Sequence, residues 1–394
     1  MFYAGIDIAK NKHEASVIDA DGKALLDSIS FANSKEGCEK LLALFERLGI
    51  AKDDVVIGME ATGHYWLSVH AFFFELDYDV KVINPIQSEA FRKMYIRQTK
   101  NDSKDSFIIA QIMRFGQFSA TNLSDEGTVA LRQFSRYRLA LVDSCGDCKR
   151  RVIALLDQVF PEYAGMFSDT FGVTSTELLL KYPTPEDMLT VSTRKLTTLL
   201  SKASRGRFGE EKAKQLKDAA AGSFGVSFAK DAFAFQIKQL MHQICFLENQ
   251  IAELENEISA LLEQLGSFIT TIPGIGDTLG AIIISEIGDI HRFSAPGKLV
   301  AFAGLDVKVN QSGEFVGTKN KLSKRGSPYL RRAIWLAATR ATFCDPTLSA
   351  YYQSLRARGK HHLTAVGAVS RKLCNIIFVI LRENRPYQIL PPNP

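Results

Sequence analysis

The chain has 394 residues, of which 46% are hydrophobic and 23% are charged. This length is too great for one ordinary core, and the composition is that of a globular protein and excludes a disordered or fibrous chain. The sequence shows neither a secretion signal at its start nor a run of about 18 uncharged apolar residues, so we expect a soluble, cytoplasmic protein that does not span a membrane.

The net charge of +5 is unevenly distributed along the chain. Residues 263–394 hold 17 Lys and Arg against 8 Asp and Glu. This asymmetry suggests a C-terminal half that faces nucleic acid, because neutralisation of phosphates dominates non-specific affinity. A solvated basic face is the alternative.

The first 85 residues alternate strand patterns with helix patterns. We predict strands over 2–8 and 13–18, a helix over 35–48, a strand over 55–59, a helix from about 65 and a strand over 80–83. This alternation is typical of a mixed α/β domain.

From residue 102 onward the pattern is mostly helical. A long basic helix is predicted over 129–159, ended by Phe160 and Pro161, and residues 162–228 form short helices separated by Pro and Gly. The only indication of a function in this second stretch is a basic cluster, formed by Lys195, Lys202, Arg205 and Arg207. We assign no activity to it at this point.

A heptad pattern follows the short helices. Isoleucine and leucine alternate at spacings of three and four, at Ile237, Leu240, Ile244, Leu247, Ile251, Leu254, Ile258, Leu261 and Leu265. Isoleucine at the a positions with leucine at the d positions favours a parallel two-stranded coiled coil, which predicts a homodimer. An intramolecular hairpin, for example with the helix over 129–159, is the alternative.

Six cysteines are scattered along the chain, as expected of reduced thiols. Cys145 and Cys148 have the spacing of half a zinc site, but no second Cys or His pair accompanies them, so incidental spacing on a helix is favoured.

Four acids stand at positions from which they can converge. Asp7 lies in an apolar strand, where a carboxylate needs a partner, and Glu60 follows the apolar strand over 55–59. Asp102 and Asp105 lie on one face of the first turn of a helix. Carboxylates in this number can hold a pair of divalent ions for phosphodiester chemistry. Taken singly, each has a simpler explanation, as an N-cap, a first-turn acid or a surface residue.

The C-terminal part carries a glycine-rich turn and a basic cluster. The turn over 272–277, with Gly274 and Gly276, is typical of a helix-hairpin-helix that binds DNA phosphate through backbone N–H groups, with a plain turn between helices as the alternative. The cluster predicts an electrostatic track for a nucleic-acid backbone and consists of Lys319, Lys321, Lys324, Arg325, Arg331 and Arg332. Ser312 on its own is an ordinary turn residue.

Together these segments resemble the Piv/MooV-type recombinases, the transposases of the insertion-sequence-110 family. The resemblance covers about residues 2–160 and 265–385. In the N-terminal part it is carried by residues 5–10, 60–65, 84–85 and 100–105, and in the C-terminal part by residues 273–276, 312–313, 324–326 and 329–332. Ser106 stands where family members usually carry alanine.

The resemblance implies a fold, a site and partners. The fold would be a RuvC-like, that is RNase H-like, α/β domain over 1–128, a helical linker with the coiled coil over 129–265, and a mostly helical transposase domain with the helix-hairpin-helix over 266–394. Asp7, Glu60, Asp102 and Asp105 would be the acids that bind Mg²⁺, and Ser312 the nucleophile that forms a phosphoseryl link to DNA. The partners would be donor and target DNA, a bridge-type guide RNA, and further copies of the chain in a dimer or tetramer.

Three other functions fit parts of the sequence. An RNase H-like endonuclease or junction resolvase would use the same acids without Ser312. An actin-like ATPase also begins with the pattern of residues 5–8, but no second glycine-rich phosphate loop follows. A DNA-binding scaffold would need neither the acids nor the serine.

Overall fold

A computed structural model describes residues 1–61, 63–83, 85–92, 102–116, 118, 125–307, 311–312, 315–316 and 321–389. The chain divides into two compact units, Met1–Leu123 and Ser124–Pro394. The helical linker and the C-terminal helices thus fall in one unit, while the three-domain division stays a prediction.

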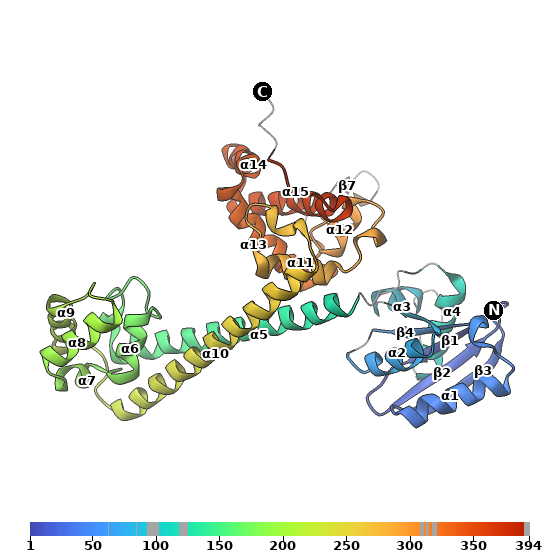
Figure 1. Ribbon diagram of the computed structural model, residues 1–394, viewed down its shortest axis with the longest axis horizontal. Coiled ribbons are helices and arrows are strands. Elements are labelled where there is room, and N and C mark those ends of the chain that lie inside the picture. The colour runs from blue at the N-terminus through green and yellow to red at the C-terminus, as the bar shows by residue number, and fades with distance from the viewer. Residues whose placement is uncertain are drawn as a thin grey trace. The chain divides into compact units, whose positions relative to one another are not determined.

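The first unit is built on a five-stranded mixed sheet (Figure 1). Its strands are β1 (Phe2–Asp7), β2 (Lys12–Ile18), β3 (Ala24–Ala32), β4 (Val55–Glu60) and β5 (Asp79–Ile83). Their order is β3-β2-β1-β4-β5; β1, β2 and β3 pair antiparallel, whereas β4 pairs parallel with β1 and β5. The mixed α/β prediction is confirmed, and β3 is an additional strand that the sequence pattern did not indicate.

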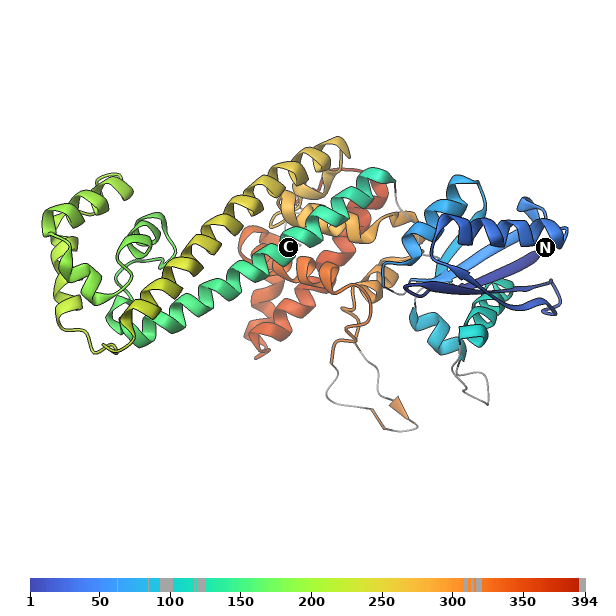
Figure 2. The same cartoon turned by 90° about the horizontal axis from the view of Figure 1, so that it is seen from below.

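Helices cover both faces of this sheet (Figure 2). They are α1 (Lys35–Arg47), η1 (Lys52–Asp54), α2 (Trp66–Glu75), α3 (Pro85–Arg92) and α4 (Asp102–Phe115). One core contains Ala4, Ile6 and Ile57 from the sheet with Leu41 of α1 and Phe73 of α2. The core of the opposite face is formed by Ile83 and four apolar residues of α4. Alternate residues of the strands therefore face different helical layers.

The second unit contains a long helical hairpin. Its helices are α5 (Glu126–Val159) and α10 (Lys230–Gln264). They run antiparallel, since Arg138 donates to Glu255 at 2.8 Å and Lys149 pairs with Glu248 at 2.7 Å. The structure thus shows the intramolecular pairing that was the alternative to a parallel coiled coil. Dimerisation through this segment stays a prediction.

Short helices form a lobe at the far end of this hairpin, between α5 and α10. They are η2 (Pro161–Tyr163), α6 (Val173–Lys181), α7 (Pro185–Thr190), α8 (Thr193–Ala203) and α9 (Glu210–Ala221). Phe160 and Tyr163 are fully buried in its core, and Cys145 of α5 belongs to the same core. The lobe therefore has an apolar centre continuous with the hairpin.

The rest of the second unit is helical and packs on the other end of the hairpin. Its elements are η3 (Phe268–Thr271), α11 (Asp277–Ile287), η4 (Ile290–Arg292), α12 (Pro296–Phe302), β6 (Gln311–Ser312), β7 (Phe315–Val316), α13 (Pro328–Cys344), α14 (Pro346–Ala357) and α15 (His362–Glu383). Leu131 of α5 and Ile258 of α10 share one core with α11, α13 and α15. The mostly helical prediction for this part is confirmed.

One helix among the described residues, α15, is long and apolar enough to cross a membrane. Within the structure 56% of its most apolar window is buried, as expected of the central helix of a folded core.

Candidate active site

Asp7 and Glu60 lie at the same edge of the sheet. They are the last residues of β1 and β4, which pair in parallel with Gly5 opposite Gly58 and Ile6 opposite Met59. One further step along this register brings Asp7 beside Glu60. The sheet thus places the two carboxylates at adjacent carboxyl ends, as the sequence predicted.

Both carboxylates belong to the face of the sheet that α4 covers. A Cβ built on Gly5 would lie 2.1 Å from the Ser106 carbonyl oxygen, and one built on Gly58 would lie 2.4 Å from Cγ of Met113. Asp7 and Glu60 stand two residues after these glycines, so they share the same face. Glycine is required at position 5 because only a residue without a side chain lets the α4 backbone come this close.

The direction of α4 brings its first turn toward the two strand ends. Gln111, farther along α4, donates to the Gly22 carbonyl at 3.3 Å, in the turn between β2 and β3. This turn lies toward the beginning of β1, because Ile18 pairs with Tyr3, so the end of β1 lies toward the beginning of α4. Asp105 lies in this first turn and is only 7% exposed. Asp102 is the first residue of α4, one helical turn earlier, but its side chain lies outside the described part. The elements that carry the four acids therefore meet at one edge of the sheet.

Two residues of α3, which the sequence analysis did not identify, hold the acids. Ser88 donates a hydrogen bond to Glu60 at 2.6 Å, and Arg92 forms an ion pair with Asp105 at 3.0 Å. Ser88 and Arg92 are four residues apart and so lie on the same face of α3. The sequence signal that could have identified them is a serine and an arginine four residues apart in the helix that follows β5.

Ser106, the residue that departs from the family pattern, is fully buried. Its hydroxyl lies 2.7 Å from that of Ser16, which also donates to the Asp27 carbonyl at 2.5 Å. The additional hydroxyl is therefore accommodated by the sheet and does not disturb the acids.

The donor chemistry of this edge fits Mg²⁺, because all candidate ligands are carboxylates. Within the described residues, however, no three His, Cys, Asp or Glu side chains stand close enough together to hold an ion. The Asp102 side chain is outside the described part, and among the described acids Glu60 is engaged by Ser88 and Asp105 by Arg92. An ion bound by these acids would have to replace the Arg92 guanidinium at Asp105.

The loop that follows β1 is fixed by a buried histidine. His13 is fully buried, and its Nδ1 accepts a hydrogen bond from the backbone N–H of Ala9 at 3.2 Å. Burial lowers the pKa of His13, against a smaller opposing effect of a hydrogen bond with Asn33. The neutral ring therefore supports the loop next to Asp7.

Ser312 lies in a β-hairpin of the second unit. In β6 and β7, Gln311 pairs with Val316 and Ser312 with Phe315. The base of this hairpin is held by a bridge between Val307 and Leu322. The Ser312 side chain lies outside the described part, so its role as a nucleophile stays a prediction.

The predicted basic track divides into exposed and engaged residues. Lys321, Lys324 and Arg325 are exposed. Arg331 donates to the Ala303 carbonyl at 3.4 Å, and Arg332 makes two hydrogen bonds of 2.7 Å to Asp143. Lys319 lies outside the described residues. Of the described cations, the first three are thus best placed for an external phosphate.

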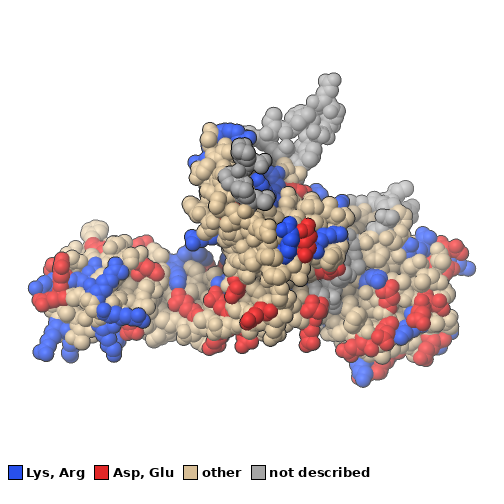
Figure 3. Space-filling view, turned by 45° about the horizontal axis from the view of Figure 1, so that its top comes forward, with Lys and Arg blue, Asp and Glu red and all other residues tan. Residues whose placement is uncertain are grey.

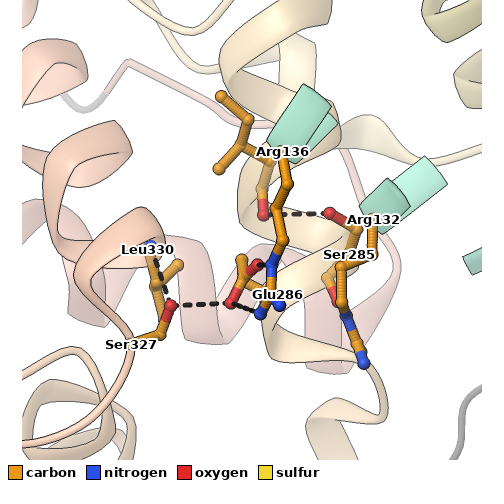
Figure 4. A network of polar contacts seen from close by, with 7 residues as sticks. Arg132, Arg136, Ser285, Glu286, Ser327 and Leu330 are labelled. Atoms are coloured by element: carbon orange, nitrogen blue, oxygen red, sulfur yellow. Dashed lines mark hydrogen bonds and ion pairs between the residues drawn. The ribbon is translucent and has the colours of Figure 1, made fainter. Parts of the chain in front are cut away.

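A buried carboxylate positions the end of this track (Figure 4). Glu286 of α11 accepts hydrogen bonds from Arg136 at 2.6 and 3.1 Å and from the Ser327 hydroxyl at 2.6 Å. Ser327 is also the N-cap of α13 and accepts from the Leu330 N–H at 3.1 Å. Burial lowers the pKa of Arg136, but its hydrogen bonds and charge interaction with Glu286 raise it overall. This network ties α5, α11 and the start of α13 together.

The two glycines of the predicted helix-hairpin-helix have different surroundings. Gly274 has φ +96°, and a Cβ there would lie 2.9 Å from the Ala337 carbonyl oxygen of α13, so this glycine is needed for internal packing. Gly276 is the N-cap of α11 and has no neighbour within 4 Å of such a Cβ. Only Gly276 is open toward a ligand, and the DNA-binding role of this turn stays a prediction.

Two family profiles match this chain. Residues 4–161 match a profile described as "Transposase", and residues 266–353 match one described as "Transposase IS116/IS110/IS902 family". These segments contain all four acids and Ser312, respectively.

Individual relatives match over nearly the whole chain. The insertion element IS110 protein of Streptomyces coelicolor is 24% identical over 99% of this chain and 96% of its own length. The pilin gene-inverting protein of Moraxella bovis is also 24% identical, over 98% of this chain and 97% of its own. Among solved structures, RuvC of Thermus thermophilus is 15% identical over 31% of this chain and all of its own, with a TM-score of 0.23. On the two profile matches, this chain belongs to the IS116/IS110/IS902 family of transposases, enzymes that cleave and rejoin DNA.

Proposed function

We propose that the chain is an RNA-guided, site-specific DNA recombinase that moves an insertion sequence. Asp7, Glu60, Asp102 and Asp105 are its proposed ligands for Mg²⁺, and Ser312 is its proposed nucleophile. The observation that carries the acid site is the meeting of β1, β4 and α4 at one edge, with Asp7 and Glu60 on the face covered by α4.

The proposed step at Ser312 is a transesterification. The serine hydroxyl gives up its proton as its oxygen forms a bond to a backbone phosphorus, the bond from phosphorus to the leaving oxygen breaks, and that oxygen takes up a proton, so that no proton is gained or lost overall. Bound Mg²⁺ would supply charge neutralisation at the phosphate. The phosphoseryl ester conserves the energy of the broken phosphodiester, so that strands can be rejoined to a new partner without ATP.

The remaining residues have supporting roles in this proposal. Lys321, Lys324 and Arg325 hold the DNA backbone near the hairpin of Ser312, and Gly276 offers a backbone N–H to a phosphate. A guide RNA selects the sites by base pairing. Its involvement follows from the family resemblance alone, and sequencing of RNA that co-purifies with the chain tests it.

Covalent capture of DNA tests the nucleophile. The chain is incubated with cleavable DNA, guide RNA and Mg²⁺, and is then denatured. We expect a protein–DNA adduct with the wild type and with Ser354→Ala, a control at an exposed position of α14, but none with Ser312→Ala. Cleavage by Ser312→Ala at the wild-type rate would contradict the serine mechanism and favour an endonuclease that uses the acids alone.

Asp7 and Ser312 belong to different units, which raises the question of whether one site draws on two subunits. We propose such a shared site. Mixing Asp7→Ala chains with Ser312→Ala chains then restores strand exchange, because one intact acid set meets one intact serine. Failure of the mixture to recover any activity, with dimers confirmed by light scattering, would argue against sharing.

A further inference from the structure

The lobe formed by η2 and α6–α9 has no part in the sites described above. It lies between the two matched segments, which end at residue 161 and resume at residue 266. Its core is continuous with that of the hairpin, and Leu196 and Leu200 of α8 and Leu216 of α9 are fully buried in it. Its surface is therefore available for a separate role.

Positive charge is concentrated on α8, α9 and the segment between them. Residues 193–217 contain 8 Lys and Arg but only 2 Asp and Glu, a net charge of +6, whereas the whole chain carries +5. Figure 3 shows Lys and Arg side chains gathered on this lobe, at the left of the view. This short segment is thus a second concentration of positive charge, besides that of residues 263–394.

Several of these cations already have partners inside the lobe. Lys214 pairs with Glu210 at 2.8 Å, and Lys217 donates to the Leu189 carbonyl at 3.2 Å. Lys212 lies over the rings of Phe167 and Phe208, at 5.3 and 6.0 Å. The cations of α9 are thus largely used within the fold.

The cations along α8 are different. Lys195, Lys202 and Arg205 are exposed, and no carboxylate of the described residues forms an ion pair with them. Lys195 and Lys202 are seven residues, or two turns, apart, so they lie on one face about 10 Å from each other. Arg205 follows directly after the helix, in a left-handed backbone conformation with φ 54°. We call these three residues the α8 stripe.

The α8 stripe has the composition of a phosphate-binding surface. The exposed residue Thr198 stands between its two lysines, and hydroxyl groups are common donors to phosphate oxygens. A separation of about 10 Å is comparable to the width of about 12 Å of a DNA major groove, so two cations can reach phosphates on its two sides.

We propose that the α8 stripe binds the phosphodiester backbone of a duplex nucleic acid, without reading its sequence. The inference rests on the proposed function only in that the chain handles nucleic acid. Either the DNA substrate or the paired part of a guide RNA can supply such a backbone. The experiment below distinguishes these two ligands by measuring binding to a DNA duplex and to an RNA duplex.

The test compares two triple variants with the same loss of charge. One is Lys195→Gln, Lys202→Gln, Arg205→Gln. The control is Arg150→Gln, Lys181→Gln, Lys214→Gln, which removes three exposed cations that are ion-paired with Asp147, Glu177 and Glu210. Binding of the full chain to a labelled 25-base-pair duplex, of DNA or of RNA, is measured by fluorescence anisotropy at several salt concentrations.

We expect the stripe variant to bind at least one of the duplexes roughly tenfold to a hundredfold more weakly at 0.15 M salt. The plot of the logarithm of the association constant against the logarithm of the salt concentration has a negative slope. Its magnitude should decrease by about two to three, since each lost phosphate contact contributes about 0.9 for B-DNA. A loss with DNA alone identifies the substrate as the ligand, and a loss with RNA alone identifies the guide. Equal binding by the stripe variant and the control, with both duplexes, would overturn the proposal.

Two further measurements keep this result interpretable. A charge-conserving variant, Lys195→Arg, Lys202→Arg, Arg205→Lys, should bind as the wild type does, and loss of binding in it would show that charge is not what matters. Covalent capture by Ser312 is measured on the same proteins. If the wild type forms no adduct but the stripe variant still loses affinity, the proposed serine chemistry fails while the binding surface stands.

Discussion

The close approach of α4 to the sheet can be tested at Gly5, which is not itself a proposed ligand. In a Gly5→Ala variant the new Cβ would lie 2.1 Å from the Ser106 carbonyl oxygen and 2.4 Å from the Ala110 amide nitrogen. The first distance is 1.3 Å shorter than the 3.4 Å at which ordinary van der Waals contact begins. Both neighbours are backbone atoms and cannot rotate away, so α4 must move from the sheet by about 1 Å.

This displacement has two measurable effects. Overpacking of a core costs about 1 to 3 kcal/mol, and we expect a loss near 3 kcal/mol in the free energy of unfolding of the first unit because the backbone must yield. Catalytic ligands must be held to within about 0.5 Å, so moving the first turn of α4 should also weaken metal binding. With Mn²⁺ as the probe for the proposed Mg²⁺ site, we expect an affinity about tenfold or more below that of the wild type. No carboxylate is altered by the substitution.

The two tryptophans allow the first unit to be observed by itself. Trp66 is in the first unit and Trp335 in the second, so a Trp335→Phe background leaves fluorescence from Trp66 alone. A loss of 3 kcal/mol lowers the urea midpoint by about 2 M when the slope is about 1.5 kcal/mol per M. Mn²⁺ affinity is measured by calorimetry on the same full-length chain.

Gly146→Ala serves as the matched control. Gly146 lies in α5, and a Cβ there would meet only a side-chain nitrogen of Arg150, at 3.5 Å. Alanine in a helix is favoured over glycine, and this substitution lies in the second unit, so the Trp66 unfolding midpoint and the Mn²⁺ affinity of the first unit should equal those of the wild type. A wild-type midpoint and wild-type Mn²⁺ affinity in Gly5→Ala would refute the reasoning about α4.

Three further predictions concern residues that the structure shows in contact. Replacing Arg92 by Gln removes the cation that competes for Asp105 and should strengthen Mn²⁺ binding severalfold in calorimetry; an unchanged or weaker affinity would contradict this. Glu286→Gln should lower the stability of the second unit by about 2 kcal/mol, because its buried carboxylate accepts charged hydrogen bonds. In a double-mutant cycle with Arg136→Met the losses should be less than additive, and simple addition would mean that the pair is not coupled. Because burial lowers the pKa of His13 below its unfolded value of about 6.5, the unfolded state binds the proton first. The contribution of His13 to the free energy of unfolding of the first unit is therefore complete above this pH, and below it this contribution falls by up to about 1.4 kcal/mol per pH unit. In urea titrations between pH 7 and 5, the His13→Gln variant should lose less stability with falling pH than the wild type.

The adjacent positions of Asp7 and Glu60 could be predicted because each is marked by its local sequence. Asp7 and Glu60 each follow a run of apolar residues with strand pattern, and a carboxylate at that point indicates that the buried part of the strand ends there. Parallel pairing of those strands then brings the carboxylates together without any further information. The strand β3 was missed because only one of its nine residues is buried and the others are half-buried or exposed, so that it lacks a regular apolar alternation.

The partners of those acids could not be predicted from the sequence. Arg92 and Asp105 are joined only when α3 and α4 pack on the same face of the sheet, and neither residue carries a local mark of that contact. Arg136 and Glu286 are 150 positions apart and meet only in the folded second unit. A heptad pattern likewise indicates that α10 packs against another helix, but the pattern does not identify that helix as α5.

The contacts of α3 link the stability of the metal-free state to the affinity for metal. In the proposed acid site the carboxylates repel one another, and the Arg92 guanidinium, which pairs with Asp105, compensates part of this charge when no ion is bound. The same guanidinium must leave Asp105 when an ion binds there. The stabilisation that the Arg92–Asp105 ion pair gives to the protein without metal is then lost, so the ion pair weakens metal binding by that amount. Arg92→Gln should therefore lower the urea midpoint of the first unit without metal and raise its affinity for Mn²⁺, two effects of opposite sign. A residue that only supports the fold would weaken both.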